Sequence, residues 1–202
     1  MELVFAGAMT SRVRRRRVRP PQDLAMDRYA RGDEAAFGEL YDAIAPRLYA
    51  FLLRQTRSEA AAKDVLQQTM LKIHLARGTF EEGAAVLPWA YAIARRLWID
   101  STRRVKRESP LDETHEEAAG DPSPDDTAYA GELAARLAKE LAKLPENQRV
   151  AFQLVKQEEL SIAEAAAVLG TTESAVKLRA HRAYQTLRAA LGDLMPFKEE
   201  SE

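Results

Sequence analysis

The chain of 202 residues is predicted to be all-α, with two small helical domains joined by a flexible acidic linker. Alanine, leucine, glutamate and arginine, which favour helices, dominate the composition, and alternating β-branched runs are scarce. Several stretches place apolar residues at helical spacing. Between them lies ESPLDETHEEAAGDPSPDD, whose prolines, acidic residues and lack of bulky side chains are typical of a flexible linker.

These shifts in composition predict five segments. The first 26 residues contain RVRRRRVRPP, which lacks apolar periodicity, and are expected to form a disordered basic arm. An equally open alternative is that translation begins at Met26. The predicted parts are the arm at 1–26, an N-terminal helical domain at 27–107, the linker at 108–131, a C-terminal helical domain at 132–195 and a disordered tail at 196–202.

In the N-terminal domain, apolar residues recur at helical spacing from Asp33 to about Arg57. Pro46 is expected to divide this stretch into two helices, because proline suits a first turn and not a helix interior. A further helix is expected from Ser58 to Ala76, with one apolar stripe facing inward. Its other face carries Asp64, Gln67, Gln68, Leu71 and Leu75.

Two interpretations of that other face remain open. Leu71 and Leu75, surrounded by amides and a carboxylate, have the apolar centre and polar rim of a surface that docks on another protein. Alternatively, both leucines pack against a neighbouring helix of the same domain. The periodicity of a single helix does not decide between these interpretations.

After a loop at 78–87, Pro88 is expected to start a helix that ends near Arg107. Trp89, Tyr91 and Trp98 are candidates for stacking on unpaired bases, and four arginines are candidates for binding phosphates. Tryptophans at such spacing commonly fill a core, so at least one of the two is expected to be buried. The four arginines are Arg95, Arg96, Arg103 and Arg104.

The segment 161–191 predicts a helix, a tight turn and a second helix. Ser161 and Glu164 have the spacing of a capping box, in which each side chain bonds the backbone of the other residue. Gly170 stands where the first helix must end, and glycine accepts the left-handed conformation of such an end. The two threonines that follow are candidates for capping the second helix.

The second helix of this segment has the layout of a recognition helix that lies in a DNA major groove. Polar and basic residues occupy the side opposite its inward stripe. The alternative is an ordinary helical hairpin with a solvated basic face, because short motifs also arise by chance. The inward stripe is expected to comprise Val176, Ala180, Ala183 and Leu187. The outer side is expected to comprise Ser174, Lys177, Leu178, His181, Gln185 and Arg188, with Arg179 and Arg182 on its flanks.

Several classes of protein are excluded. Without cysteine the chain forms no disulfide and no thiolate metal site, and its three histidines lack the spacing of metal ligands. Paired carboxylates, a nucleophile elbow and a phosphate-binding loop are all missing, so no catalytic activity, cofactor or small-molecule substrate is expected. No apolar run approaches the roughly 20 residues that span a bilayer, so a cytoplasmic location is expected.

The charge distribution indicates how such a protein would meet DNA. The formal net charge is −1, and basic and acidic residues nearly balance within each predicted helical domain. Tight binding of the protein alone to DNA is therefore not expected, because phosphate neutralisation supplies much of that affinity. This pattern favours a protein that reads DNA as part of a larger assembly.

Four stretches, in a fixed order and separated by the linker, carry a resemblance to a known family. They resemble the bacterial extracytoplasmic-function (ECF) sigma factors of the sigma-70 family. The sequence departs from the family pattern at Gln68, where an acidic residue is usual, and at Arg96, where asparagine is frequent. The start of the recognition helix also differs, so promoter preference is not transferred. The stretches are GDEAAFGELYDAIAPRLYAFLLR, AAKDVLQQTMLKIHL, LPWAYAIARRLWIDSTRR and LPENQRVAFQLVKQEELSIAEAAAVLGTTESAVKLRAHRA.

The resemblance implies a non-catalytic subunit that binds core RNA polymerase and directs it to promoter DNA. It also implies an anti-sigma factor as a further partner. Lys177 and Arg179 would contact base edges, and Arg182 would hold phosphate. The implied residues are Asp64, Gln67, Gln68 and Leu71 for polymerase, Phe80, Trp89, Arg95, Arg96, Arg103 and Arg104 for the −10 element, and Ser174, Lys177, Arg179, His181 and Arg182 for the −35 element.

A second hypothesis is an independent helix-turn-helix regulator whose N-terminal domain dimerises or senses a ligand. Such a protein needs a dimer interface, because one helix-turn-helix alone has little affinity for a short site. The stretches that resemble polymerase-docking and DNA-melting helices argue against it. Two roles remain open for the linker, which either threads through a basic channel of polymerase or is a passive tether.

Overall fold

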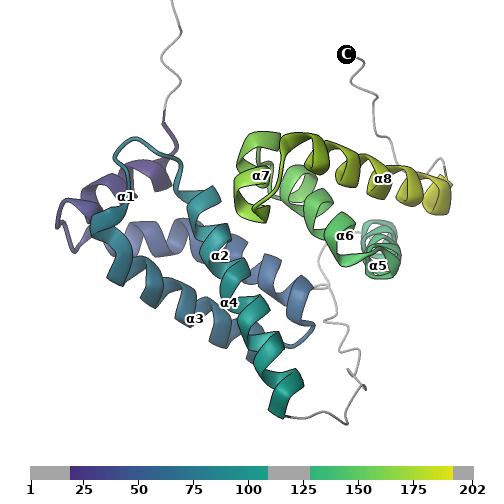
Figure 1. The fold of residues 1–202 in the computed structure, drawn as a ribbon, viewed down its shortest axis with the longest axis horizontal. Helices are drawn as coiled ribbons and strands as arrows, with labels where there is room; N and C mark the ends of the chain where they lie inside the picture. The colour runs from purple at the N-terminus through teal and green to yellow at the C-terminus, as the bar shows by residue number, and fades with distance from the viewer. Residues whose placement is uncertain (1–18, 109–127, 193–202) are drawn as a thin grey trace, which may run out of the picture.

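The computed structural model describes residues 19–108 and 128–192, and every regular element in these two ranges is a helix. The helices form two groups that lie side by side (Figure 1). The predicted all-α fold with two helical domains is thereby confirmed. The predictions for the linker at 109–127, for the arm before residue 19 and for the tail after residue 192 lie outside the described residues.

The N-terminal domain consists of four helices. They are α1 (Pro21–Ala30), α2 (Ala36–Thr56), α3 (Glu59–Ala76) and α4 (Val86–Glu108), with a short 3-10 turn, η1 (Arg77–Thr79), after α3. α2 contacts each of the other three helices, and α3 also packs on α4. α2 is therefore the central element, and α3 and α4 each keep one long face away from it (Figure 1).

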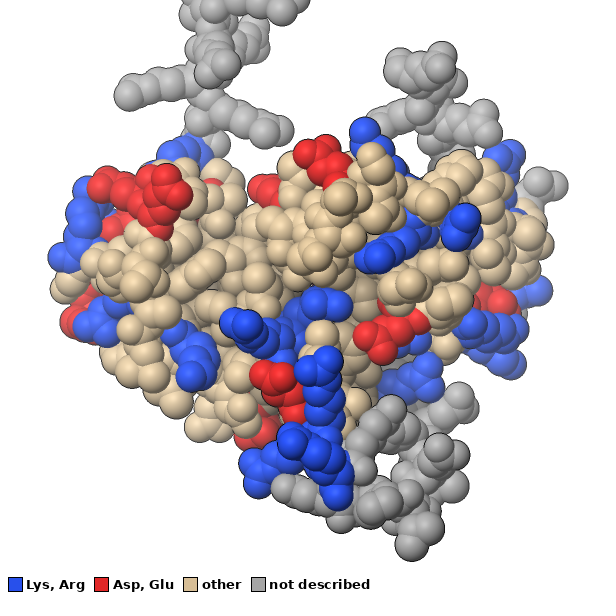
Figure 2. Space-filling model, in the orientation of Figure 1, with Lys and Arg blue, Asp and Glu red and all other residues tan. Residues whose placement is uncertain are grey.

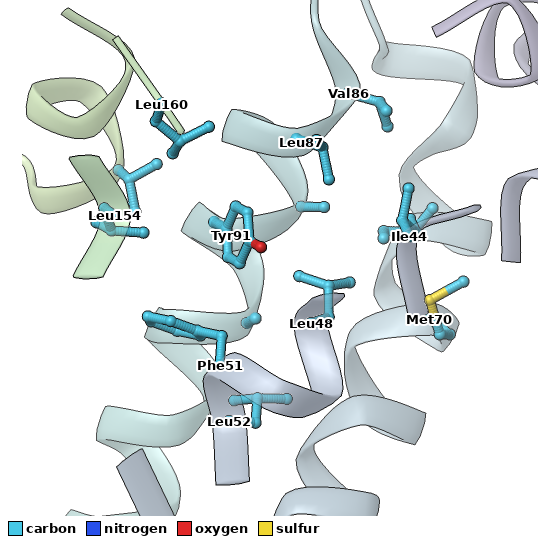
Figure 3. Packing of buried hydrophobic residues seen from close by; sticks show 14 of the residues in the cluster. Ile44, Leu48, Phe51, Leu52, Met70, Val86, Leu87, Tyr91, Leu154 and Leu160 are labelled. Carbon is cyan, nitrogen blue, oxygen red and sulfur yellow. The ribbon is translucent and has the colours of Figure 1, made fainter. Parts of the chain in front are cut away.

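One face of α2 supplies much of the core. Ile44, Leu48, Phe51 and Leu52 recur at helical spacing, and their side chains are fully buried (Figure 3). They meet Met70 of α3, together with apolar residues from the start of α4. The helical periodicity that predicted an amphipathic element between Asp33 and Arg57 thus corresponds to real burial.

The prediction that Pro46 divides this stretch is wrong, because α2 continues through it without interruption. An interior proline removes one backbone hydrogen bond and costs about 3 kcal/mol. Here Pro46 and Asp42, whose carbonyl loses its partner, both lie on the exposed side, where water can replace the lost bond. Buried Ile44 and Leu48 on the opposite side favour one continuous helix.

The prediction of a disordered arm at 1–26 is wrong for residues 21–26, which belong to α1. This segment is helical, and Ala25 and Met26 are buried in the core. Two carboxylates of α1 hold the loop before α4. Asp23 accepts a hydrogen bond from the backbone N–H of Val86 (2.9 Å), and Asp27 accepts one from that of Gly83 (3.1 Å).

The Asp27 carboxylate also gives the protein a pH-dependent contribution to stability. A hydrogen bond from Arg19, assisted by the Gly83 N–H, lowers the pKa of Asp27 below its ordinary value, although burial opposes this shift. A carboxylate with a lowered pKa stabilises the fold at neutral pH, and this contribution is lost as the pH falls through the lowered pKa.

Asp27→Asn is therefore expected to reduce the free energy of unfolding by about 1–2 kcal/mol at pH 7. The difference from the wild-type protein should shrink progressively below about pH 4, where the wild-type carboxylate also becomes protonated. Urea unfolding of both proteins between pH 7 and pH 3 measures it. A difference that stayed constant over this range would contradict the assignment.

The C-terminal domain also consists of four helices. They are α5 (Ala128–Lys143), α6 (Glu146–Phe152), α7 (Ile162–Leu169) and α8 (Glu173–Leu191), and one π-helical turn, η2 (Gln153–Gln157), extends α6. α5, α6 and α7 all contact α8. α5 begins before residue 132, so its first turn lies within the segment predicted to be linker.

The turn between α7 and α8 has the predicted local structure. Ser161 and Glu164 form the capping box, and Gly170 ends α7 in the left-handed conformation at φ 61°. Thr172 caps α8 by accepting a hydrogen bond from the N–H of Ala175 (3.2 Å). The expected stripe on α8 is buried, namely Val176, Ala180, Ala183 and Leu187.

No helix within the described ranges is both long enough and apolar enough to cross a membrane.

Candidate polymerase and promoter surfaces

The outer face of α8 presents the predicted recognition residues to solvent. Ser174, Lys177, His181 and Arg182 are exposed, and Arg179 is half-buried. Leu178 lies among them with about half of its surface exposed (49%). Figure 2 shows blue lysine and arginine atoms along this helix. A capped helix with exposed hydrogen-bond donors on one side has the geometry that a major groove accepts.

The outer face of α3 carries the residues predicted to contact core RNA polymerase. Leu71 and Leu75 are 56% and 68% exposed, so neither leucine packs against a neighbouring helix. Asp64, Gln67 and Gln68 are exposed beside them, and the Gln68 amide donates a hydrogen bond to the Asp64 carboxylate (2.8 Å). Of the two interpretations that the sequence left open, intramolecular packing is excluded and an exposed apolar patch with a polar rim remains.

The arginines predicted to bind the −10 element all lie on α4 and differ in exposure to solvent. Arg103 and Arg104 are exposed near the end of the helix, where Figure 2 shows a concentration of blue atoms at the lower tip of the molecule. Arg96 is also exposed, two residues before the buried Trp98. Arg95 is half-buried and faces the C-terminal domain.

The aromatic residues of this segment divide into buried and accessible ones. Tyr91 is fully buried and Trp98 nearly so, which corrects the suggestion that they stack on unpaired bases. The expectation that at least one tryptophan fills the core is confirmed by Trp98. Phe80 is only 9% exposed, and its ring packs on that of Trp89 with centroids 5.2 Å apart. Trp89 alone of these four keeps an intermediate exposure.

Arg95 brings the two predicted DNA-binding surfaces into electrostatic contact. Burial lowers the pKa of the Arg95 guanidinium, and the positive charge of Arg179 on α8 lowers it further, while Glu146 opposes both effects. The buried Nε of Arg95 has no hydrogen-bond partner among the described residues. Arg95 of the predicted −10 surface and Arg179 of the predicted −35 surface are therefore close enough for their charges to interact in this structure.

Sequence reasoning missed the residue that joins the two domains. Glu158, at the end of η2, is 5% exposed and accepts hydrogen bonds from Arg54 of α2 and Tyr91 of α4. No signal in the sequence separated it from the other glutamates, because its partners lie about 70 and 100 residues away along the chain. Its charge is compensated across the boundary between the domains.

Comparison with known families assigns each domain to a region of one protein family. A family profile described as Sigma-70 region 2 matches residues 40–108, and one described as Sigma-70, region 4 matches residues 134–187. The first match covers α3 and α4 with most of α2, and the second covers the helix-turn-helix of α7 and α8. Both candidate surfaces thus lie within regions of one family.

Two relatives match over most of their length. The RNA polymerase sigma factor CarQ of Myxococcus xanthus is 35% identical over 170 residues, which cover 84% of this chain and 97% of CarQ. The ECF RNA polymerase sigma factor SigF of Caulobacter vibrioides is 36% identical over 159 residues, which cover 77% of this chain and 86% of SigF.

Solved structures agree with this placement. The sigma factor RpoE of Bartonella quintana, in complex with the anti-sigma factor NepR, aligns with a TM-score of 0.69 at 25% identity over 79% of this chain and 98% of RpoE. CnrH, in complex with the cytosolic domain of CnrY, aligns with a TM-score of 0.62 at 26% identity over 87% of this chain and all of CnrH. The chain belongs to the ECF group of the sigma-70 family and is an RNA polymerase sigma factor.

Proposed function

We propose that the exposed face of α3 docks on core RNA polymerase. The exposed Leu71 would be the apolar anchor, and Asp64, Gln67 and Gln68 would fix the register around it. Interfaces concentrate binding energy in a few central apolar residues surrounded by polar ones, and this face has that composition. The N-terminal domain at 27–107, extended by the first turns of α1, would be the polymerase-binding unit.

The same domain would capture the −10 element after the duplex opens. Flipping a base out of a duplex costs a few kcal/mol, which stacking and edge contacts must return. Trp89 is partly exposed and would stack on a base, and Phe80, whose ring packs on that of Trp89, would fix its orientation. Arg95, Arg96, Arg103 and Arg104 would bind the phosphates along α4.

The C-terminal domain at 132–195 would read the −35 element through α8. The exposed row of Ser174, Lys177, His181 and Arg182 on a helix with a capped N-terminus is the observation that supports this most directly. Lys177 and Arg179 would contact base edges, since a cation can bond guanine O6 and N7. Ser174 and Arg182 would hold phosphates.

We further propose that the protein acts without catalysis of its own and is regulated by an anti-sigma factor. The solved relatives RpoE and CnrH are described in complexes, the first with the anti-sigma factor NepR and the second with CnrY. A protein that bound both domains of this chain would cover the face of α3 and the face of α8 together. As a subunit of polymerase, the protein would act in the cytoplasm, where bacterial transcription takes place.

The roles assigned to two residues of α8 predict different results. Lys177→Ala should cost about 1–3 kcal/mol at promoters that carry the preferred base at one −35 position, and nothing where that base is already changed. Arg182→Ala should weaken binding to all promoter variants alike and reduce the salt dependence of binding. Holoenzyme binding to a panel of single-position −35 variants measures both. Uniform weakening by Lys177→Ala would move Lys177 to the phosphate contacts.

A further inference from the structure

The loop at 80–85 connects η1 with α4 and lies beside α1, which holds it by two carboxylates (Figure 1). Oδ1 of Asp27 accepts the hydrogen bond from the N–H of Gly83 (3.1 Å), and Oδ1 of Asp23 accepts that from the N–H of Val86 (2.9 Å). The two aspartates are only 5% and 7% exposed. Burial of a carboxylate is costly unless hydrogen bonds compensate for it, so the loop and α1 stabilise one another.

Arg19, which lies just before α1, adds a third attachment. Its guanidinium donates one hydrogen bond to the backbone carbonyl of Ala84 (3.4 Å) and another to Oδ2 of Asp27. The bond from Arg19 is the main cause of the lowered pKa of Asp27. The Asp27 carboxylate therefore bonds Arg19 with one oxygen and the loop with the other, and Arg19 itself reaches the loop.

The loop contains backbone N–H groups that need partners from outside it. The N–H of Ala84 bonds the carbonyl three residues earlier (3.0 Å), which closes a turn, and Gly83 has a φ of 88°. A positive φ at the third position is typical of a type II turn, in which the N–H of that residue points away from the turn's own hydrogen bond. Asp27 accepts this N–H. Val86 begins α4, so its N–H has no partner in its own helix, and Asp23 supplies one.

Both ends of this loop are joined to the side chain proposed above to stack on an unpaired base. The ring of Phe80, at the start of the loop, packs on that of Trp89 with centroids 5.2 Å apart. Trp89 also lies three residues after Val86, at the start of α4. Between these two connections, Glu81, Glu82, Gly83 and Ala85 are exposed. The position of Trp89 relative to these exposed residues therefore depends on the shape of the loop.

The free energies involved make that shape important for base capture. Fixing the backbone of one residue costs about 1–2 kcal/mol. Stacking on one base contributes only about 1–3 kcal/mol. A loop that had to order several residues during capture would lose most of what stacking provides. Because α1 already holds the loop in the free protein, this ordering cost arises during folding and not during capture.

We propose that Arg19, Asp23 and Asp27 are positioning residues for recognition of the −10 element: they hold the loop at 80–85 in the conformation that, together with Trp89, receives one unpaired base. The inference rests on the base capture by Trp89 proposed above. The two buried aspartates would act through the loop and not by touching DNA. The −10 surface would thus depend on α1, which lies outside the residues 40–108 that match the region 2 profile.

Arg19→Ala, combined with removal of single bases from the promoter, tests this proposal. The variant loses two of the bonds described above, and the Arg19 side chain is 33% exposed, so the fold should tolerate the change. Holoenzyme is assembled with core polymerase, and permanganate reactivity reports opening of promoters that carry an abasic site at each −10 position of the non-template strand in turn. We define base dependence as the factor by which the most damaging abasic site reduces opening relative to the intact promoter.

We expect a base dependence of at least about fivefold for the wild-type protein, which corresponds to the loss of stacking on one base. Arg19→Ala should open the intact promoter about fivefold less well and show a base dependence below about twofold, because the two changes remove the same interaction. A merely structural role would not give this result, since lower stability reduces opening of intact and abasic promoters by the same factor.

Two variants of Asp23 give an independent measurement. Asp23→Ala removes the acceptor for the N–H of Val86 and should lower base dependence as Arg19→Ala does. Asp23→Asn keeps a carbonyl oxygen that can accept the same bond, so it should restore most of the base dependence. If Asp23→Ala does not fold, Arg19→Ala and Asp23→Asn still form a testable pair.

Arg28→Ala is the matched control, because Arg28 belongs to α1 and its ion-pair partners among the described residues, Asp33 and Glu39, lie outside the loop. It should keep the base dependence of the wild type. A wild-type protein without base dependence at any −10 position would overturn base capture itself, and this inference with it. Wild-type base dependence that persists unchanged in folded Arg19→Ala and Asp23→Ala would overturn only the positioning role of α1.

Discussion

Leu71→Asp is expected to lower the affinity of the protein for core RNA polymerase by at least about 30-fold, which corresponds to the loss of a 2 kcal/mol hot-spot residue. The substitution would remove the proposed apolar anchor and would place a carboxylate, which is costly to desolvate, at the centre of the proposed interface. The side chain is 56% exposed in the free protein, so the fold should tolerate the change. Titration of labelled protein with purified core polymerase measures the affinity.

A matched control exists on another helix. Leu24 of α1 is 48% exposed and lies outside the face of α3, so Leu24→Asp introduces the same chemistry at a similar exposure. We expect Leu24→Asp to leave polymerase affinity within about twofold of the wild type, since isolated surface substitutions have small effects. Circular dichroism should show equal helicity for both variants. Unchanged affinity of a folded Leu71→Asp protein would exclude Leu71 from the docking surface.

Trp89→Ala is expected to reduce promoter opening by about 5- to 150-fold, because stacking on one base contributes about 1–3 kcal/mol. Initial binding of the holoenzyme to duplex promoter DNA should change little, since unpaired bases become available only after opening. Permanganate reactivity of thymines near −10 reports opening, and a gel shift at low temperature reports initial binding.

Two further variants make the promoter-opening experiment on Trp89 more specific. Trp89→Phe keeps an aromatic face and should retain much of the opening activity, whereas Phe80→Leu should have an intermediate effect because it removes the ring that supports Trp89. Thermal unfolding of each variant shows whether the core has been disturbed. Full permanganate reactivity with a folded Trp89→Ala protein would rule out stacking by this residue.

The elements that could be predicted from sequence are those whose determinants are local. The apolar periodicity of α3 and of α8 identified the buried and the exposed face of each helix, because apolar residues at helical spacing mark the buried face without reference to the rest of the chain. The capping box at Ser161 and Glu164 and the left-handed Gly170 were predictable for the same reason. These signals depend on residues three to ten positions apart, so no knowledge of tertiary structure was needed.

The features that were missed depend on distant partners. α1 has little apolar periodicity, and its Asp23 and Asp27 are buried because they bond a loop about 60 residues away. Pro46 is tolerated because it lies on the exposed side of α2, and buried residues before and after it, Ile44 and Leu48, anchor the helix in the core. In sequence, Tyr91 and Glu158 look like an accessible aromatic residue and a surface carboxylate. In the structure both are buried, and the Tyr91 hydroxyl donates a hydrogen bond to Glu158 across the boundary between the domains.

As an RNA polymerase sigma factor, this protein is expected to select promoters as a subunit of polymerase and not by itself. Run-off transcription with purified core polymerase, on DNA from upstream of its own gene, tests it most directly, together with a gel shift by the protein alone. We expect initiation at a defined start site that requires the protein, and no shift of the same DNA without polymerase. A specific shift by the protein alone, with no initiation when core polymerase is added, would instead indicate an independent regulator.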